Sequence, residues 1–304
     1  MNKETDKEKN MTPLFSILLA NYNNSAFIDE CLESIYKQSY TNWEVIFIDD
    51  YSIDNSLDII NIYSNKDTRI KVFVNESNKG CGFTKARCIQ LASGEICGFL
   101  DTDDALMPNA LELMIKKHIE SPNASIVYSR HYNCDENLII HDISSDDTGK
   151  FISQLDTPLI NHFATFKKIM YDQTIGIDTY MKRAVDQDLF LKLEEKGTII
   201  FTPEILYLYR HNSNSISLND NEYKAVAWFI YAIGNACKRR NLSLDDYCNI
   251  IKSINFINKL NKQYDKLNNN VFYLLRRCII LLIKIILPRK IFKLLKEHKN
   301  NGND

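Results

Sequence analysis

A short acidic segment, Asp101 to Asp104, follows an apolar run of the chain. Asp101 and Asp103 alternate with Thr102, so in an extended segment their side chains would face the same way. Paired carboxylates are ligands for a hard cation such as Mg²⁺ or Mn²⁺, which could bridge diphosphate oxygens. Alternatively, Asp103 and Asp104 stabilise the N-terminus of a helix expected from Pro108. The spacing does not decide between these two interpretations.

A further carboxylate of interest is Asp186, in a segment that leads into an amphipathic helix over Leu189, Phe190 and Leu193. A carboxylate beside an acceptor hydroxyl would act as a general base. An Asp at a helix N-terminus is commonly only a cap, and the residues alone favour the cap slightly.

Four more residues have the chemistry to hold a nucleotide. Asp50 could accept a hydrogen bond from a base imide, and the Tyr22 ring could stack on the base, or Tyr22 is only a partly buried loop aromatic. Lys79 and Arg87 carry donors suited to a diphosphate, although each could equally be a solvated surface charge.

The elements that position these residues are apolar runs separated by amphipathic stretches. We expect strands at Phe15–Ala20, Trp43–Asp49, Ile70–Val74, Glu95–Leu100 and Ala124–Tyr128. We expect helices at Ala26–Lys37, through Leu57 and Tyr63, at Thr84–Ala92 and at Pro108–Glu120. Continuously apolar strands joined by helices predict an α/β fold with an open, mostly parallel sheet covered on both faces.

In such a sheet, ligands bind beyond the carboxyl ends of the strands. The residues that follow the first four strands are Asn21-Tyr22-Asn23-Asn24, Asp49-Asp50, Asn78-Lys79-Gly80 and Asp101-Thr102-Asp103-Asp104. The sequence therefore predicts that four polar clusters meet at one edge of the sheet.

Five motifs, in this order and spacing, resemble the family-2 glycosyltransferases of the GT-A fold over Leu14 to Ser217. They are Ser16 to Asn23, Ile48 to Asp54, Asn78-Lys79-Gly80 with Ala86-Arg87, Ala92-Ser93-Gly94-Glu95, and Leu100 to Asp104. The resemblance implies a Rossmann-like GT-A domain over 13–218.

By this resemblance, Ala20, Tyr22 and Asp50 would line the nucleoside pocket, and Lys79, Arg87, Asp101 and Thr102 would also contact the donor. Asp103, with Asp104, would hold Mn²⁺ or Mg²⁺, and Asp186 would be the general base. The implied reaction is a direct displacement with inversion, from a nucleotide-sugar donor, with UDP-sugar favoured, to a hydroxyl of a saccharide or lipid-linked saccharide. Such an enzyme would serve cell-surface polysaccharide or glycolipid synthesis.

The sequence departs from the family pattern at several points. Val185 replaces an acidic neighbour of Asp186, His211 stands one position early in a Tyr-Arg-x-His loop, and Tyr51 replaces a usual Gly. These changes leave open a non-catalytic nucleotide- or carbohydrate-binding module on the same fold. The segment that contains His162 and Thr165 resembles the acceptor-side segment of the family. Alternatively, His162 is a histidine of the protein core. A Gln-x-x-Arg-Trp motif is missing, which favours transfer of a single sugar over processive synthesis.

Charge is unevenly distributed along the chain. The segment 271–304 has eight Lys or Arg against Glu297 and Asp304, while the whole chain has a net charge of -2. We expect a helical region over 219–304, whose basic amphipathic tail (271–299) binds a membrane surface or packs on protein. The low overall charge and the lack of basic-aromatic motifs argue against a nucleic-acid partner.

The N-terminal segment 1–12 is polar and has no apolar core, which predicts a disordered arm rather than a signal peptide. Eight cysteines are scattered without a Cys-x-x-Cys pair, a pattern typical of buried free thiols in a reducing compartment. We therefore expect a cytoplasmic protein, peripheral on the cytoplasmic face of the membrane.

Overall fold

The computed structural model describes residues 12–144, 153–155, 160–211 and 222–253. The chain divides into two compact units, Met1–Asn219 and Asp220–Asp304, which are treated separately below. The N-terminal arm expected over 1–12, apart from Thr12, and the basic tail expected over 271–299 lie outside the described residues.

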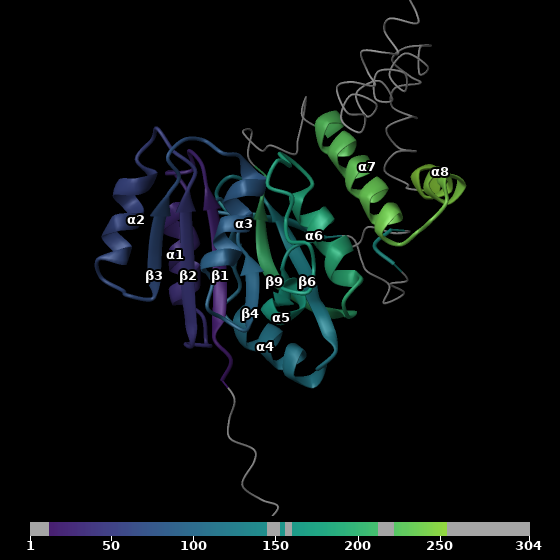
Figure 1. Cartoon of the computed structure of the whole chain (residues 1–304). Coiled ribbons are helices and arrows are strands. Elements are labelled where there is room, and N and C mark those ends of the chain that lie inside the picture. The colour runs from purple at the N-terminus through teal and green to yellow at the C-terminus, as the bar shows by residue number, and fades with distance from the viewer. Residues whose placement is uncertain (1–11, 145–152, 156–159, 212–221, 254–304) are drawn as a thin grey trace, which may run out of the picture. The chain divides into compact units, whose positions relative to one another are not determined.

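The described strands of the first unit form one nine-stranded sheet in the order β3-β2-β1-β4-β8-β6-β9-β5, with β7 paired to β6 (Figure 1). The strands are β1 (Phe15–Asn21), β2 (Trp43–Asp49), β3 (Ile70–Val74), β4 (Ile96–Phe99), β5 (Ala105–Leu106), β6 (Ala124–Cys134), β7 (Ile140–Ile143), β8 (Ala164–Lys167) and β9 (Thr198–Arg210). The helices are α1 (Ile28–Tyr36), α2 (Ser56–Ser64), α3 (Cys81–Leu91), α4 (Ala110–Glu120), α5 (Lys168–Tyr171) and α6 (Val185–Glu194).

The first four strands are parallel, as the sequence predicts. β1 pairs with β2 on one side and with β4 on the other, and β2 pairs with β3. Beyond β4 the sheet is mixed, because β8 runs antiparallel to both β4 and β6 while β6 and β9 are parallel. Six of the nine strands, β1 to β4, β6 and β9, thus run in the same direction, while β5, β7 and β8 run against them. The expected open, mostly parallel α/β sheet is confirmed.

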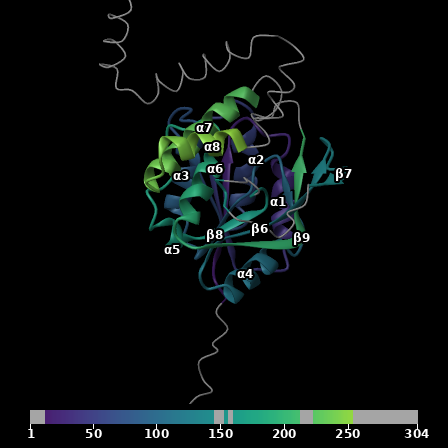
Figure 2. The ribbon, with the colours of Figure 1, turned by 90° about the vertical axis from the view of Figure 1, so that its right-hand side faces the viewer.

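Helices cover both faces of this sheet. Figure 2 shows α1 on the opposite side of the sheet from α3, α5 and α6. Right-handed crossovers place a helix on the other face where the strand order reverses direction, which happens between β3 and β4, so both apolar faces of the sheet are buried. The continuous apolar runs of β1 and β2 are explained by this arrangement, since nearly all their residues are buried.

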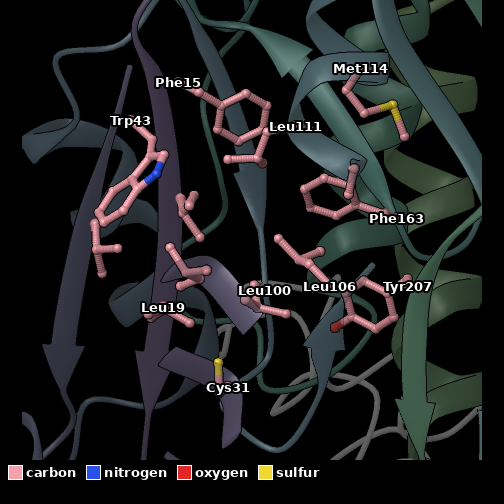
Figure 3. Close-up of a cluster of buried hydrophobic side chains, with 14 of the residues drawn as sticks. Phe15, Leu19, Cys31, Trp43, Leu100, Leu106, Leu111, Met114, Phe163 and Tyr207 are labelled. Carbon is pink, nitrogen blue, oxygen red and sulfur yellow. The ribbon is translucent and has the colours of Figure 1, made fainter. Parts of the chain in front are cut away.

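A cluster of buried hydrophobic side chains lies where α1, α2 and α4 meet the sheet (Figure 3). Phe15 and Trp43 enter it from neighbouring strands, and Leu111 and Met114 enter it from α4. Tyr207 of β9 also belongs to the cluster although it carries a hydroxyl. That hydroxyl donates a hydrogen bond to Asp104, at the candidate site described below.

Several boundaries differ from the sequence-based prediction. The strand expected to end at Tyr128 continues to Cys134, because its second half pairs with both β7 and β9. The helix expected from Leu189 begins at Val185, so Asp186 lies in its first turn. The stretch between Tyr128 and Lys182 had no readable periodicity, and its described part contains β7, β8 and α5.

The second unit contains α7 (Glu222–Arg239) and α8 (Leu244–Ser253), both within the region 219–304 expected to be helical, of which the structure describes 222–253. A capping box begins α8: the Ser243 hydroxyl accepts from the Asp246 amide, and the Asp246 carboxylate accepts from the Ser243 amide. Across the described ranges, we find no helix with the length and apolar character needed to cross a bilayer.

One motif of the sequence has a packing explanation. Gly94 passes so close to β1 that an added Cβ would lie 2.6 Å from the Leu14 carbonyl oxygen and 2.6 Å from Ser16 Oγ. Its amide also donates to Ser16 Oγ at 2.8 Å. Only glycine fits this contact between β1 and the turn before β4 without moving the backbone.

We predict that Gly94→Ala lowers the free energy of unfolding by about 1–3 kcal/mol, because the methyl group overpacks this contact. Gly234→Ala is the matched control, since its Cβ would meet the Tyr247 ring at an ordinary 3.6 Å and alanine favours a helix. Denaturant unfolding of both variants measures the difference. An equal stability of Gly94→Ala and wild type would contradict the packing account.

Candidate active site

The predicted meeting of polar clusters at one edge of the sheet is confirmed for the ends of β1, β2 and β4. The Asn21 amide nitrogen donates to Asp49 Oδ1 at 2.8 Å, and its oxygen accepts from the Thr102 hydroxyl at 3.0 Å. Asn24 Nδ2 donates to the same Thr102 oxygen at 3.0 Å. Thr102, predicted to contact the donor, is instead buried, and its hydrogen bond to Asn21 connects the segment Asp101 to Asp104, the acidic turn, to β1.

Asp50 anchors the loop that leads into α3. Its Oδ1 accepts from Asn75 Nδ2 at 2.7 Å and from the Lys79 amide at 2.8 Å, and its Oδ2 accepts from the Gly80 amide at 2.7 Å. A hydrogen bond from a nucleobase would share these oxygens with the chain. Tyr51, next to it, adopts φ 67°, which explains why a glycine suits this turn.

The other predicted nucleotide contacts lie in different surroundings. Ala20 is half-buried on β1, and Tyr22 follows it with 47% of its surface exposed. Lys79 is exposed on the loop before α3. Arg87 does not join the acidic loop, because its Nη1 donates to the Val74 carbonyl at 2.9 Å and to Asn75 Oδ1 at 2.6 Å.

The segment Asp101 to Asp104 forms a tight turn rather than the extended strand assumed above, since the Asp104 amide donates to the Asp101 carbonyl at 2.9 Å. Exposure nevertheless alternates: Asp101 and Asp103 are half-buried, whereas Thr102 and Asp104 are buried. The capping alternative is wrong, because α4 begins after Asn109 and no carboxylate of this turn caps it.

Asp104 is turned into the protein, which corrects its expected role as a metal ligand. Its Oδ2 accepts from the Tyr207 hydroxyl at 2.7 Å, and its Oδ1 accepts from the Arg210 amide at 2.7 Å. Burial raises the pKa of Asp104 well above its usual range, and the charges of Asp103 and Asp101 raise it further. The Asp104 carboxyl group therefore holds the turn against β9 through these two hydrogen bonds.

Arg210 also supports the turn, a role that its place in the sequence did not predict. Its side chain is buried, its Nε donates to the Asp103 carbonyl at 2.5 Å, and its Nη1 donates to the Glu136 carbonyl. Its Nη2 pairs with Glu30 at 2.6 Å. The sequence signal for this supporting role is an arginine at the end of a largely apolar strand, β9.

Asp186 is brought to the same edge by α6. The residue before the helix, Ala184, adopts a left-handed conformation with φ 54°, and no side chain caps the helix. The capping role that the residues alone favoured for Asp186 is therefore wrong in this structure. Its carboxylate, 30% exposed, instead accepts from Lys85 Nζ at 2.8 Å through each oxygen.

Lys85 forms ion pairs with both Asp186 and Asp101 of the acidic turn. The sequence motifs did not single out this lysine. Its Nζ is 3.5 Å from Asp101 Oδ1, and its side chain is 5% exposed. Burial lowers the pKa of Lys85, but Asp101 and Asp186 outweigh this effect and hold the pKa well above its usual range. A lysine on the buried face of α3, beside Thr84, Cys88 and Ile89, was the available signal.

Asp101 is held in its charged form by these neighbours. Burial would raise its pKa, but the Lys85 ammonium and, after it, His162 lower the pKa below its usual range. His162 Nε2 lies 4.0 Å from Asp101 Oδ2, and its ring stacks on Tyr207 and Tyr209 with centroid distances of 4.8 and 5.6 Å. Burial lowers the pKa of His162, which favours the neutral imidazole.

Two other residues singled out in the sequence lie apart from the acidic turn. Thr165 is buried on β8, where its hydroxyl donates to the Val127 carbonyl and contacts His118 Nε2. His211 is exposed and its Nε2 lies 3.2 Å from Asn133 Oδ1. Neither residue contacts Asp101 or Asp186 through a side-chain hydrogen bond described for it.

The donor set at this edge suits a hard cation. Asp101 and Asp103 offer carboxylate oxygens from one turn, which are the ligands preferred by Mg²⁺ and Mn²⁺. Within the part of the chain that the structure describes, no three His, Cys, Asp or Glu side chains are grouped to hold a metal alone. A cation held by Asp101 and Asp103 would complete its coordination with water or with oxygens of a bound molecule such as a diphosphate.

Comparisons with known proteins identify the family and the fold. The sequence profile described as Glycosyl transferase family 2 matches residues 16–189, more than half of the chain. The chain belongs to this family. The family profile therefore covers β1 through the first turns of α6, including the acidic turn, Lys85 and Asp186.

Two relatives of this family-2 chain are a polysaccharide synthase and a glucosyltransferase by their names. It is 26% identical over 303 residues to a chondroitin synthase of Pasteurella multocida, covering 97% of this chain and 31% of that protein. It is 29% identical over 277 residues to UDP-Glc:alpha-D-GlcNAc-diphosphoundecaprenol beta-1,3-glucosyltransferase WfgD of Escherichia coli, covering 91% and 94%. The chain thus spans about a third of the length of the first relative.

A solved structure gives the same fold. TarS residues 1–349 of S. aureus, in complex with UDP-GlcNAc, superimposes with a TM-score of 0.58 at 21% identity. The match covers 78% of this chain and 70% of TarS 1–349. The GT-A fold expected from the sequence is confirmed.

We predict that Arg210→Met lowers the free energy of unfolding by about 2–3 kcal/mol, because it removes a buried guanidinium and leaves the carbonyls of Asp103 and Glu136 without their charged donor. Arg69→Met is the control, since Arg69 is 40% exposed and its pair with Asp67 is worth less than about 1 kcal/mol. Denaturant unfolding tests both variants. Equal losses for the two variants would contradict the supporting role of Arg210.

Proposed function

We propose that this chain transfers a single sugar from a nucleotide-sugar donor to a hydroxyl acceptor with inversion of the anomeric centre. The observation that carries the proposal is the convergence of two carboxylates from distant parts of the chain. Asp101, after β4, and Asp186, on α6, both pair with the Lys85 ammonium group, at 3.5 and 2.8 Å. Direct displacement needs a base for the acceptor and a separate centre for the leaving group.

In this proposal the residues divide the reaction between them. Asp186 accepts the proton of the acceptor hydroxyl as that oxygen attacks the anomeric carbon, and the nucleoside diphosphate leaves on the opposite face. Asp101 and Asp103 would hold Mn²⁺ or Mg²⁺, whose charge would offset that of the diphosphate. Asp104, Tyr207 and Arg210 keep the acidic turn in place.

The donor side is assigned to the strand ends beside the turn. Ala20, Tyr22 and Asp50 would receive the nucleoside, with the Tyr22 ring exposed enough to stack on a base. Lys79, exposed nearby, and Arg87 are the predicted cations for the donor. The names of WfgD and of the TarS complex, which specify UDP-Glc and UDP-GlcNAc, support a UDP-sugar.

We predict that Asp186→Asn keeps donor binding but lowers kcat by about 10²- to 10⁴-fold, because it removes the base. Asp103→Asn should lose the increase in Tm that donor and Mn²⁺ produce together in wild type. Asp172→Asn, an exposed carboxylate beside Lys168, is the matched control and should behave as wild type.

The experiment combines a panel of sugar nucleotides with Mn²⁺, Mg²⁺ or a chelator, measuring Tm and product release. If wild type binds the donor but transfers no sugar to an acceptor, as expected of Asp186→Asn, the result would favour the alternative, a non-catalytic binding module. A wild type that binds no sugar nucleotide under any metal condition would refute the proposal altogether.

We further propose that the acceptor is a saccharide or lipid-linked saccharide and that the basic segment 271–299 binds the cytoplasmic face of a membrane. The segment alternates apolar runs with Arg276, Arg277 and Lys284. Basic residues beside apolar ones suit anionic lipid. The WfgD acceptor, a diphosphoundecaprenol by its name, supports a lipid-linked substrate.

We predict that the full chain sediments with vesicles containing anionic lipid and not with neutral vesicles. Replacing Arg276, Arg277 and Lys284 by Gln should weaken binding by about 1 kcal/mol per charge. The same binding to neutral vesicles, or no effect of the three substitutions, would contradict an electrostatic membrane contact.

A further inference from the structure

The ammonium of Lys85 lies between the two carboxylates on which the proposed reaction depends. Its Nζ is 2.8 Å from each oxygen of Asp186 and 3.5 Å from Asp101 Oδ1. The lysine side chain is 5% exposed, whereas the Asp101 and Asp186 side chains are 35% and 30% exposed. The cation is therefore covered, and the two carboxylates keep an open edge for a ligand.

The position of this ammonium is fixed by the backbone around it. Lys85 lies on α3, one turn after Gly82, whose amide donates to the Met181 carbonyl at 3.0 Å. A Cβ at Gly82 would lie 2.5 Å from that carbonyl oxygen, so the chain that leads to α6 packs directly on α3. The Lys85 contact is thus a second link between α3 and the helix that carries Asp186.

An ammonium has three hydrogens and no acceptor, so its directions are limited. Two of the described contacts are with Asp186, and the closest remaining carboxylate is Asp101. The Phe99 ring, with its centroid 4.8 Å from Nζ, covers part of the remaining surface. Burial of such a group is costly unless opposite charges offset it, and here both opposite charges belong to the site.

We propose that Lys85 is a positioning residue for sugar transfer, which sets the place of the Asp186 carboxylate relative to the acidic turn. The inference rests on the proposed function, because it assigns the base to Asp186 and the leaving group to the turn. A base displaced by about 1 Å can lose about 100-fold in rate. Donor binding draws on Asp101, Asp103 and the nucleoside pocket. Of these groups Lys85 pairs with Asp101, at 3.5 Å, a longer contact than its two 2.8 Å hydrogen bonds to Asp186.

The test is steady-state kinetics and donor titration of Lys85→Met, which keeps the length of the side chain and removes its charge. We expect kcat to fall about 100-fold while the donor Kd stays within about threefold of wild type. Lys85→Arg restores the charge and should recover part of the lost kcat. Asp186→Asn combined with Lys85→Met should be no slower than Asp186→Asn alone, because the positioned group is already gone.

Lys71→Met is the matched control for loss of a lysine paired with a buried carboxylate. Lys71 Nζ lies 2.6 Å from Glu44 Oε2, near the start of β2 and so at the other end of the sheet. This variant should keep the kcat of wild type. Its Tm gives the stability cost of losing such a pair away from the site.

The possible results separate the two proposals. A wild-type kcat in Lys85→Met, or a parallel loss of kcat, donor affinity and Tm in that variant, overturns the positioning role while leaving the transferase proposal intact. A wild type without donor binding or turnover overturns the proposed function and the role of Lys85 with it. Loss of kcat with retained donor binding, and partial recovery in Lys85→Arg, supports both.

Discussion

Parallel pairing of β1 with β2 and β4 is the constraint from which the site follows. It brings three strand ends to one edge, where the buried Asn21 amide donates to Asp49 and accepts from Thr102. A buried amide left without partners would cost free energy, so these bonds fix the register of the loops. The acidic turn begins one residue before Thr102 and is therefore held in a set position.

Environment then gives each carboxylate at this edge a different task. Asp104 is buried against Tyr207 and Arg210, and its raised pKa favours the neutral form that supports the turn. Asp101 is kept charged by Lys85, with His162 contributing less. The two neighbouring carboxyl groups therefore differ in the protonation state that their surroundings favour.

Much of the fold could be predicted from the sequence, because β1 to β4 are continuous apolar runs with helical patterns between them. The antiparallel insertion of β8 could not, since a four-residue strand has no periodic signal and depends on its partners β4 and β6. The extension of β6 to Cys134 is likewise set by pairing rather than by local preference.

The sequence singled out Asp101 and Asp186, which the structure brings to one edge of the sheet, but not the lysine that pairs with both. Asp101, Asp103 and Asp186 follow from motif spacing, whereas Lys79 and Arg87 were the expected phosphate partners by side-chain type alone. Which face of α3 turns toward the site is decided by its packing on β1 and β2, and this selects Lys85 and directs Arg87 to the loop after β3. The role of Arg210 depends on a contact between β9 and a turn 107 positions away.

The central claim is that Asp101, Asp103 and Asp186 belong to one metal–nucleotide site. A crystal structure of the chain with UDP and Mn²⁺, using the anomalous signal of manganese, tests it most directly. The account predicts a manganese peak at coordinating distance, roughly 2.0–2.3 Å, from an oxygen of Asp101 or Asp103 and from the diphosphate, with Asp186 across from it. A nucleotide bound with its diphosphate away from this turn, or manganese bound elsewhere, would contradict it.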